Sequence, residues 1–231
     1  MIELLKDKKG IFFDVGYTLD YPASGDWMFT KKFFELTGKK ISEHRPEEIQ
    51  KAKNDGLEYL ESNHLVRNVE EEYCQFVNFY SKISQSLNLG LTQDEVNAVA
   101  YDRTYNMNNY IAYQDIKSVL KSLSMSYQLG IISDTWPSIE QQLQHLGVRD
   151  FFSTSTYSCS LGVFKPDKRM YTDALEKSGL QAEDTVFIDD SVTNLEGAAK
   201  LGITPILIAA NPNSDVDSPF FKIRTLSELL W

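Results

Sequence analysis

Three short apolar runs in this sequence end in polar residues whose types could do chemistry together. The first run ends at Asp14, the second at Ser133, and the third at Asp189 and Asp190. If the runs are parallel strands, their carboxyl ends meet at one edge of a sheet, where open α/β sheets bind ligands. Lys165, which follows a loop and opens a later helix, can reach the same edge. Carboxylates gathered there repel one another unless a cation lies among them, and oxygen ligands favour Mg²⁺. Carboxylates, a hydroxyl, a lysine and a metal ion suit a phosphoryl group.

The runs belong to a pattern in which strands and helices alternate along the second half of the chain. We expect strands at residues 11–13, 129–132, 185–188 and 203–208, and helices at 137–147, 165–179 and 192–201. Residues 153–164 receive no assignment, and the tail from residue 211 is expected to start with turns and end in a short helix. The alternation predicts an α/β fold with a doubly wound parallel sheet.

The chain between the first two strands has a different, helical character. Residues 20–26 are rich in turn formers and are expected to form a loop. Apolar residues then recur at three- and four-residue steps, which predicts helices at 27–37, 46–62, 69–88 and 93–108. Thr92 and Glu95 have the spacing of a capping box. We therefore expect an inserted α-helical bundle cap at residues 21–112 and an α/β core made of residues 1–20 and 113–231.

Composition and charge limit the partners and the compartment. The chain has 231 residues and a formal net charge of −10, which opposes binding to nucleic acid or anionic membranes. The charged N-terminus does not resemble a signal peptide, and no segment approaches the roughly 18 apolar residues of a membrane span. The two cysteines stand in unrelated surroundings, so a reducing cytoplasm is expected. The histidines lack metal-ligand spacing and are expected at the surface or at helix ends; they are His44, His64 and His145.

At this point the residues resemble the haloacid dehalogenase-like hydrolase superfamily, across essentially the whole chain. Its four motifs match, in order, Asp14–Thr18, Ser133, Lys165 and Phe187–Asn194, and the helical insertion lies where that family carries a cap. The resemblance implies a Rossmann-like core and hydrolysis through a covalent aspartyl-phosphate on Asp14. It also implies that Lys165 and the Ser133 hydroxyl neutralise charge on the phosphoryl oxygens.

The resemblance further implies a Mg²⁺ site. Asp14, the backbone carbonyl of Gly16 and Asp190 would hold the ion, with Asp189 in support. Thr18 is expected to steady the loop that carries the nucleophile. The implied substrate is a small phosphorylated metabolite, while the sequence carries no signal for an oligomeric state.

Three positions depart from the family pattern. Gly16 stands where phosphatases of the family carry an aspartate that protonates the leaving group. General acid–base assistance contributes about 10² to 10⁴ in rate, so this loss is serious but not total. Asp134 stands where asparagine is commoner, and we interpret it as the cap of a helix that begins near Trp136. Asn194 replaces an acid and lowers the negative charge of the site.

Gly16 leaves several functions open. The enzyme could favour substrates with good leaving groups, such as sugar 1-phosphates or acyl phosphates, or take the proton from a cap residue or the substrate. A non-catalytic binding or regulatory protein on the same scaffold is the alternative from another class. A haloacid dehalogenase is disfavoured because the metal-free site would leave Asp189 and Asp190 uncompensated. A mutase needs the missing proton shuttle, and a phosphonatase needs a cap lysine that forms a Schiff base; the candidates are Lys31, Lys32, Lys51 and Lys53.

Overall fold

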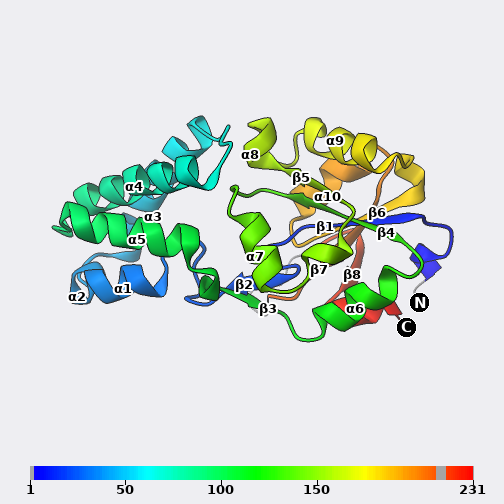
Figure 1. Ribbon diagram of the computed structural model, residues 1–231, viewed down its shortest axis with the longest axis horizontal. Coiled ribbons are helices and arrows are strands. Elements are labelled where there is room, and N and C mark those ends of the chain that lie inside the picture. Colours follow the sequence, from blue (N-terminus) through cyan, green and yellow to red (C-terminus); the bar gives the residue numbers. More distant parts are fainter. Residues whose placement is uncertain (1–2, 212–216, 231) are drawn as a thin grey trace. The chain divides into compact units, whose positions relative to one another are not determined.

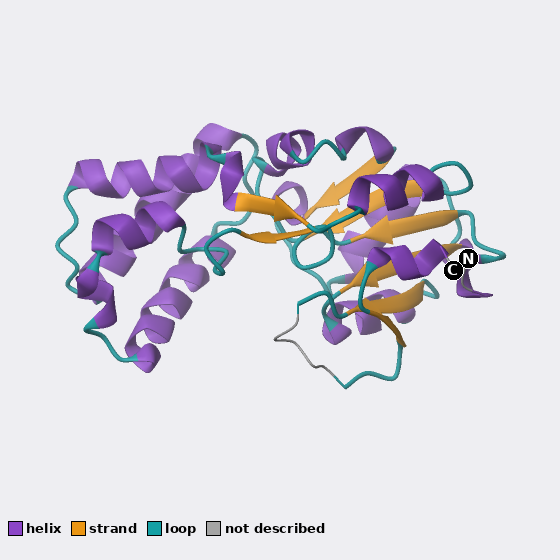
Figure 2. Cartoon of the chain, turned by 90° about the horizontal axis from the view of Figure 1, so that it is seen from below, coloured by secondary structure: helices purple, strands orange, loops and turns teal. Residues whose placement is uncertain are grey.

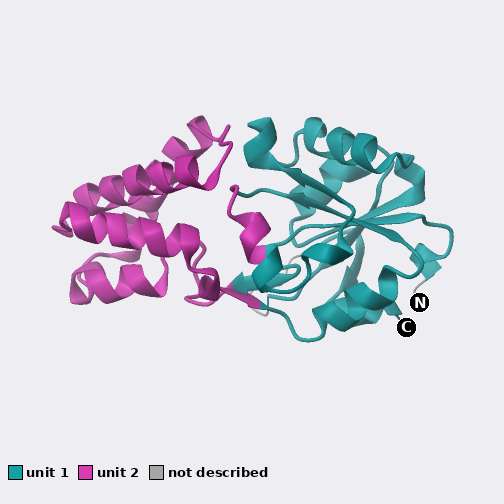
Figure 3. Cartoon of the chain, viewed as in Figure 1, with its two compact units in different colours: residues 1–21, 112–135, 143–231 teal, residues 22–111, 136–142 magenta. Residues whose placement is uncertain are grey.

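The computed structural model describes residues 3–211 and 217–230, and these residues form two compact units. Among the described residues, the core unit comprises 3–21, 112–135, 143–211 and 217–230. The cap unit comprises residues 22–111 and 136–142 (Figure 3). The predicted cap boundaries, 21–112, lie one residue from this division at each end. The segment 136–142, predicted as core, groups with the cap.

The core unit is built on a six-stranded sheet in which every neighbouring pair of strands is parallel (Figure 1). The strand order is β5-β4-β1-β6-β7-β8. These strands are β1 (Gly10–Phe13), β4 (Gln128–Ser133), β5 (Thr154–Tyr157), β6 (Thr185–Asp189), β7 (Thr204–Ile208) and β8 (Phe221–Ile223). The helices of the core unit are α6 (Ile116–Leu123), α8 (Ser158–Leu161), α9 (Lys168–Ser178) and α10 (Val192–Ala199). Helix α7 (Ile139–His145) begins in the residues of the cap unit and ends in those of the core unit. The predicted α/β fold with a parallel sheet is confirmed.

The register of the central strands fixes where the polar strand ends meet. Phe13, the last residue of β1, pairs with Ile131 in β4 on one side and with Ile188 in β6 on the other. All four residues of β1 are buried, as expected for a central parallel strand covered on both faces. The residues that come just after these paired positions on β1, β4 and β6 therefore lie at the same edge of the sheet.

Close packing on one face of the sheet holds these strands together. Phe12 and Phe187 belong to a buried cluster with Tyr171 of α9 and Leu195 of α10. A Cβ at Gly130 would lie 2.8 Å from a ring carbon of Phe12, so the neighbouring strand accepts no larger residue there without displacement. Figures 1 and 2 show the sheet and the helices that flank it.

The cap unit is helical around an aromatic core. Its helices are α1 (Lys31–Thr37), α2 (Lys39–Ser42), α3 (Pro46–Ser62), α4 (Val69–Ser86) and α5 (Gln93–Tyr105). Side chains of Thr30, Asn68 and Thr92 cap α1, α4 and α5 by accepting backbone N–H bonds in the first turn. Fully buried Phe76, from α4, packs against other aromatic rings of the bundle.

Short strands account for most of the differences from the predicted elements. The expected loop at residues 20–26 begins with β2 (Asp20–Pro22), which pairs with β3 (Tyr110–Ala112) where the chain enters and leaves the cap unit. The edge strands β5 and β8 were also not predicted. The predicted helix 93–108 ends at Tyr105, and the expected terminal helix is a short 3₁₀ helix at Leu226–Leu230. No helix in the described part of the chain is long and apolar enough to cross a membrane.

Candidate active site

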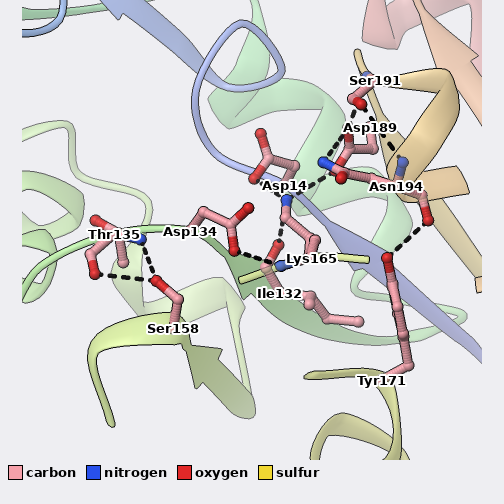
Figure 4. A network of polar contacts seen from close by, with 10 residues as sticks. All are labelled: Asp14, Ile132, Asp134, Thr135, Ser158, Lys165, Tyr171, Asp189, Ser191 and Asn194. Carbon is pink, nitrogen blue, oxygen red and sulfur yellow. Dashed lines mark hydrogen bonds and ion pairs between the residues drawn. The ribbon is translucent and has the colours of Figure 1, made fainter. Parts of the chain in front are cut away.

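Lys165 joins the carboxyl ends of the central strands (Figure 4). Its Nζ donates to Asp14 Oδ1 at 2.6 Å, to Asp189 Oδ2 at 2.7 Å and to the backbone oxygen of Ile132 at 3.2 Å. Asp14 follows β1, Asp189 ends β6 and Ile132 lies in β4, so one ammonium group spans three adjacent strands. The ammonium is buried, which makes these hydrogen bonds little screened by water.

A tight turn presents Asp14 and the glycine two residues later. The backbone N–H of Asp14 donates to Ile188 O at 2.9 Å, which ties the nucleophile candidate to β6. The oxygen of Val15 accepts three successive N–H groups, from Thr18, Leu19 and Asp20. Tyr17 has φ +54°, and its N–H donates to Asp20 O at 2.7 Å.

Thr18, which is part of this turn, is fully buried. Its hydroxyl has no hydrogen-bond partner among the described residues. The residue lines a pocket of about 150 Å³ with Tyr113 and Arg224 in the core unit. That Thr18 steadies the loop stays a prediction, and within the described part of the chain its hydroxyl makes no hydrogen bond that would support it.

The carboxylate of Asp189 is held from three directions. Besides the Lys165 ammonium, the backbone N–H of Ser191 donates to it at 2.7 Å. The side-chain amide of Asn194 donates to both of its oxygens, at 3.2 Å to Oδ1 and 3.1 Å to Oδ2. Asn194 is in turn tied by its backbone oxygen, which accepts the Tyr171 hydroxyl at 2.7 Å. Sequence reasoning assigned Asn194 only an effect on net charge and missed this amide donor.

The interpretation of Asp134 as a helix cap is wrong. Helix α7 begins only at Ile139, and Asp134 Oδ1 instead accepts the backbone N–H of Lys165 at 2.9 Å. The next residue is also fixed, because Thr135 N–H donates to Ser158 Oγ at 2.7 Å. Ser133, buried at the end of β4, begins this loop. Asp134 therefore positions the backbone of the lysine, which no local sequence pattern could reveal.

Burial, together with repulsion between carboxylates, raises the pKa values of Asp14 and Asp190 at this edge. Burial raises the pKa of Asp14 well above its ordinary value, and Lys165 partly offsets this effect. Burial alone would lower the pKa of Lys165, but the Asp14, Asp189 and Asp134 carboxylates outweigh it and raise that pKa. Burial, followed by repulsion from Asp189, raises the pKa of Asp190 to about 6.

Asp190 is the acid of the site that is best placed to bind a cation. It is half-buried, its own backbone N–H interacts with its carboxylate, and within the described ranges 3–211 and 217–230 no other side chain forms a hydrogen bond or ion pair with it. In the same described ranges, no three His, Cys, Asp or Glu side chains form a metal cluster by themselves. The set predicted from sequence needs only two carboxylates, from Asp14 and Asp190, and the Gly16 carbonyl.

In the cap unit, His64 and Lys53 both contact specific partners. His64 is not a surface residue: it is buried against the edge of the Trp136 ring at 5.0 Å between centroids, and burial lowers its pKa to about 4. Among the lysines considered for a Schiff base, Lys53 is engaged in an ion pair with Asp26 at 2.5 Å.

The chain is similar to a named phosphatase and a named nucleotidase over part of their length. It is 29% identical over 117 residues to a glyceraldehyde 3-phosphate phosphatase of Methanocaldococcus jannaschii, covering 49% of this chain and 51% of the relative. It is 36% identical over 75 residues to the Escherichia coli GMP/IMP nucleotidase YrfG, covering 32% and 34%. The chain thus spans about half or less of these relatives.

Solved structures share the fold over nearly the whole chain. A HAD phosphatase from Thermococcus onnurineus superimposes with a TM-score of 0.65 at 20% identity, covering 96% of this chain and 95% of that one. A 2-haloacid dehalogenase from Pseudomonas syringae gives 0.64 at 19% identity, covering 96% of each chain. The putative HAD-hydrolase YfnB from Bacillus subtilis, bound to magnesium, gives 0.66 at 18%, covering 97% of each.

The family itself follows from the sequence match. The family model for haloacid dehalogenase-like hydrolases matches residues 53–208, more than half of the chain. The match includes Ser133, Lys165, Asp189 and Asp190 but begins after Asp14. This chain belongs to the haloacid dehalogenase-like hydrolase family.

Proposed function

We propose that this protein is a Mg²⁺-dependent phosphatase that hydrolyses a small phosphorylated metabolite through a phosphoryl group carried on Asp14. The observation that carries the proposal is the double contact of Lys165, whose ammonium binds both Asp14 and Asp189 while Asp190 keeps a carboxylate without a cation. A site with one lysine and three acids still carries excess negative charge, which a hard divalent cation balances. The relatives named as a glyceraldehyde 3-phosphate phosphatase and a GMP/IMP nucleotidase support the same class of reaction.

The chain's own residues supply the nucleophile and its orientation. Lys165 holds Asp14 through Oδ1 and so fixes the rotation of its carboxylate. During attack on phosphorus, negative charge shifts toward the phosphoryl oxygens, where the Lys165 ammonium and the Ser133 hydroxyl stabilise it. Displacement of the leaving group forms the phosphoryl-aspartate, and water then releases phosphate and restores Asp14.

The donor set fits a magnesium ion. The Asp190 carboxylate, the second oxygen of Asp14 and the Gly16 carbonyl would supply hard oxygen ligands. Burial, followed by repulsion from Asp189, raises the pKa of Asp190, and a cation beside it would stabilise its charged form. When bound, the ion neutralises the phosphoryl group and the nucleophile so that the two anions can approach. Asp189 takes a supporting role because Lys165, Ser191 and Asn194 already engage its oxygens.

Gly16 limits the leaving groups that this site handles well. With no acid at this position, an alkoxide leaving group must take its proton from the substrate, from water or from the cap. Since that assistance contributes about 10² to 10⁴ in rate, substrates with acidic leaving groups gain the advantage. Acyl phosphates and sugar 1-phosphates are therefore the favoured subclass.

A binding or regulatory protein on this scaffold is the second candidate, and Gly16 is the observation in its favour. Against it stands the Lys165 bridge, because a binding module has no need for a buried lysine aimed at a potential nucleophile. A dehalogenase needs no metal and would keep Asp190 uncompensated.

The test is a panel of phosphate monoesters, acyl phosphates and 2-haloacids, assayed with Mg²⁺ and with EDTA. We expect Mg²⁺-dependent phosphate release, fastest on activated esters, and none from Asp14→Asn. Chloride release without a metal would instead support a dehalogenase. No turnover on any compound would support the binding protein.

A further inference from the structure

A fully buried acid of the cap unit holds the chain that follows the Ser133 loop. Glu72 lies in the first turn of α4, and none of its surface is exposed. Its Oε2 accepts the backbone N–H of Ser138 and its Oε1 accepts the Ser138 hydroxyl, both at 2.7 Å. Both residues belong to the cap unit, because residues 136–142 group with the helices.

A buried cation of the cap completes the environment of this acid. Arg103 Nη1 of α5 lies 4.0 Å from Glu72 Oε1, and its guanidinium packs over the Phe76 ring at 4.6 Å. A carboxylate is rarely buried without such partners, since desolvation of an unpaired charge is costly. The Glu72 carboxylate therefore accepts two hydrogen bonds from Ser138 and forms one ion pair with Arg103.

A second set of contacts anchors the same segment two residues earlier. Trp136 Nε1 donates to Gln75 Oε1 at 3.1 Å, and its ring lies 5.4 Å from Phe76 and 5.0 Å from His64, between centroids. Trp136 and Ser138 thus both attach to α4, so the segment has one fixed register on the helix.

The other end of this chain stretch is fixed in the core. Thr135 N–H donates to Ser158 Oγ, and Asp134 accepts the backbone N–H of Lys165. Only Trp136 and Pro137 separate these anchors from Ser138. So short a linker has few soft dihedral angles, because each residue contributes at most two and the φ of Pro137 is fixed by its ring.

We propose that Glu72 and Ser138 form a positioning clamp, through which the cap unit holds the loop that carries Ser133 and Asp134 in its working conformation. Neither residue touches the reacting atoms; they act through the short chain that leads to Asp134 and thus to the Lys165 backbone. The effect on turnover rests on the proposed phosphatase function, whereas the effect on the loop does not.

Backbone hydrogen exchange of the whole protein tests the clamp without any substrate. The amides to follow are those of Ser138, Thr135 and Lys165, with Asp14 N–H, bonded to Ile188 O, as reference for global opening. In Glu72→Leu we expect exchange at Ser138 to rise about tenfold, the upper end for loss of one hydrogen bond. We expect a smaller rise, about threefold, at Thr135 and Lys165, after normalisation to Asp14.

Glu72→Leu leaves the buried Arg103 guanidinium without its anionic partner, and the variant could therefore fail to fold. Milder variants keep the test decisive in that case. Glu72→Gln retains one acceptor and should give an intermediate increase. Ser138→Ala removes only the hydroxyl bond and leaves the ion pair with Arg103 intact. The matched control is Thr37→Val, which deletes another buried cap hydroxyl, bonded to Phe33 O at 2.8 Å, and should change none of the three amides.

The outcomes separate the clamp from the proposed function. Faster exchange at Thr135 and Lys165 in the Glu72 and Ser138 variants, but not in Thr37→Val, supports the clamp even if no phosphatase substrate is found. If turnover is found, kcat should fall in the order Ser138→Ala, Glu72→Gln, Glu72→Leu. Exchange that changes at Ser138 alone, with Thr135 and Lys165 as in the unmodified protein, overturns the clamp even in an active phosphatase.

Discussion

Asn194 donates its side-chain amide to both carboxylate oxygens of Asp189, at 3.2 and 3.1 Å. The contact keeps the Asp189 carboxylate oriented toward Lys165, whose Nζ lies 2.7 Å from Asp189 Oδ2. An acid at position 194 would instead confront Asp189 with a like charge. The choice of asparagine is therefore part of the site's charge balance.

Substitution of Asn194 should destabilise the protein in a pH-dependent way. Asn194→Leu removes the amide donors and is expected to lower the free energy of unfolding by about 1.5 to 3 kcal/mol. Asn194→Asp should cost more at pH 7, because repulsion raises carboxyl pKa values in the folded state and stability then falls as pH rises. Urea unfolding at pH 5 and pH 7 measures both. Equal stability of the two variants at pH 7 would show that Asp189 does not feel the added charge.

Removal of the buried lysine should expose the repulsion that it suppresses. Lys165→Met leaves Asp14 and Asp189 without their shared cation, and breaking a buried pair from one side costs about 3 to 5 kcal/mol. Stability should recover as the pH falls, since protonated acids need no counter-ion. Thermal unfolding of the variant and the unmodified protein from pH 5 to pH 8 gives the difference. A constant difference across that range would contradict the electrostatic account.

Replacement of Gly16 by aspartate should add a general acid. Because this assistance is worth about 10² to 10⁴ in rate, Gly16→Asp is expected to accelerate hydrolysis of alkyl phosphates by at least about tenfold, with little gain on acyl phosphates. Gly16→Asn is the matched control of similar size. Equal rates for the two variants on alkyl phosphates would mean that another group already supplies the proton.

Magnesium binding should weaken as the pH falls through the titration of Asp190, whose pKa burial and Asp189 raise to about 6. The ion binds the deprotonated carboxylate, so below that pKa affinity should drop about tenfold per pH unit. In the absence of metal, Asp190 affects the stability of the fold in the opposite direction: whereas Mg²⁺ affinity increases with pH, stability decreases. The raised pKa means that the folded state binds the extra proton, so the Asp190 contribution to stability is present at low pH and is lost as pH rises through 6.

Calorimetric titration with Mg²⁺ at pH 5, 6 and 7 measures this dependence. Asp190→Asn should bind weakly at all three values and remove the pH dependence. Affinity that stays constant from pH 5 to 7 in the unmodified protein would exclude Asp190 as a ligand that titrates in this range.

Much of the site was predictable because it is local in sequence. A buried strand followed at once by an acid predicts where the acid lies once neighbouring strands are parallel, and this holds for Asp14 and Asp189. The alternating pattern likewise predicts the sheet. The position of Lys165 after a loop and at the start of a helix predicts that it can reach the same edge, and the distances from its ammonium to both acids confirm this.

The remaining features depend on tertiary contacts. Asp134 was misinterpreted because its partner, the Lys165 backbone, is distant in sequence. Strand β5, with Thr154–Tyr157, has too few apolar residues to stand out from a loop. Glu72 offered one unused signal: it lies four residues before Phe76, on the buried stripe of its helix, where an acid requires a buried partner.

The covalent step on Asp14 is tested most directly by acid quenching during turnover of an activated phosphate ester with Mg²⁺, followed by peptide mass spectrometry. The proposed function predicts one phosphoryl group on the peptide that contains Asp14, absent with EDTA and absent in Asp14→Asn, which should also release no phosphate. Turnover that continues in Asp14→Asn, or proceeds with the phosphoryl group on another residue, would contradict it.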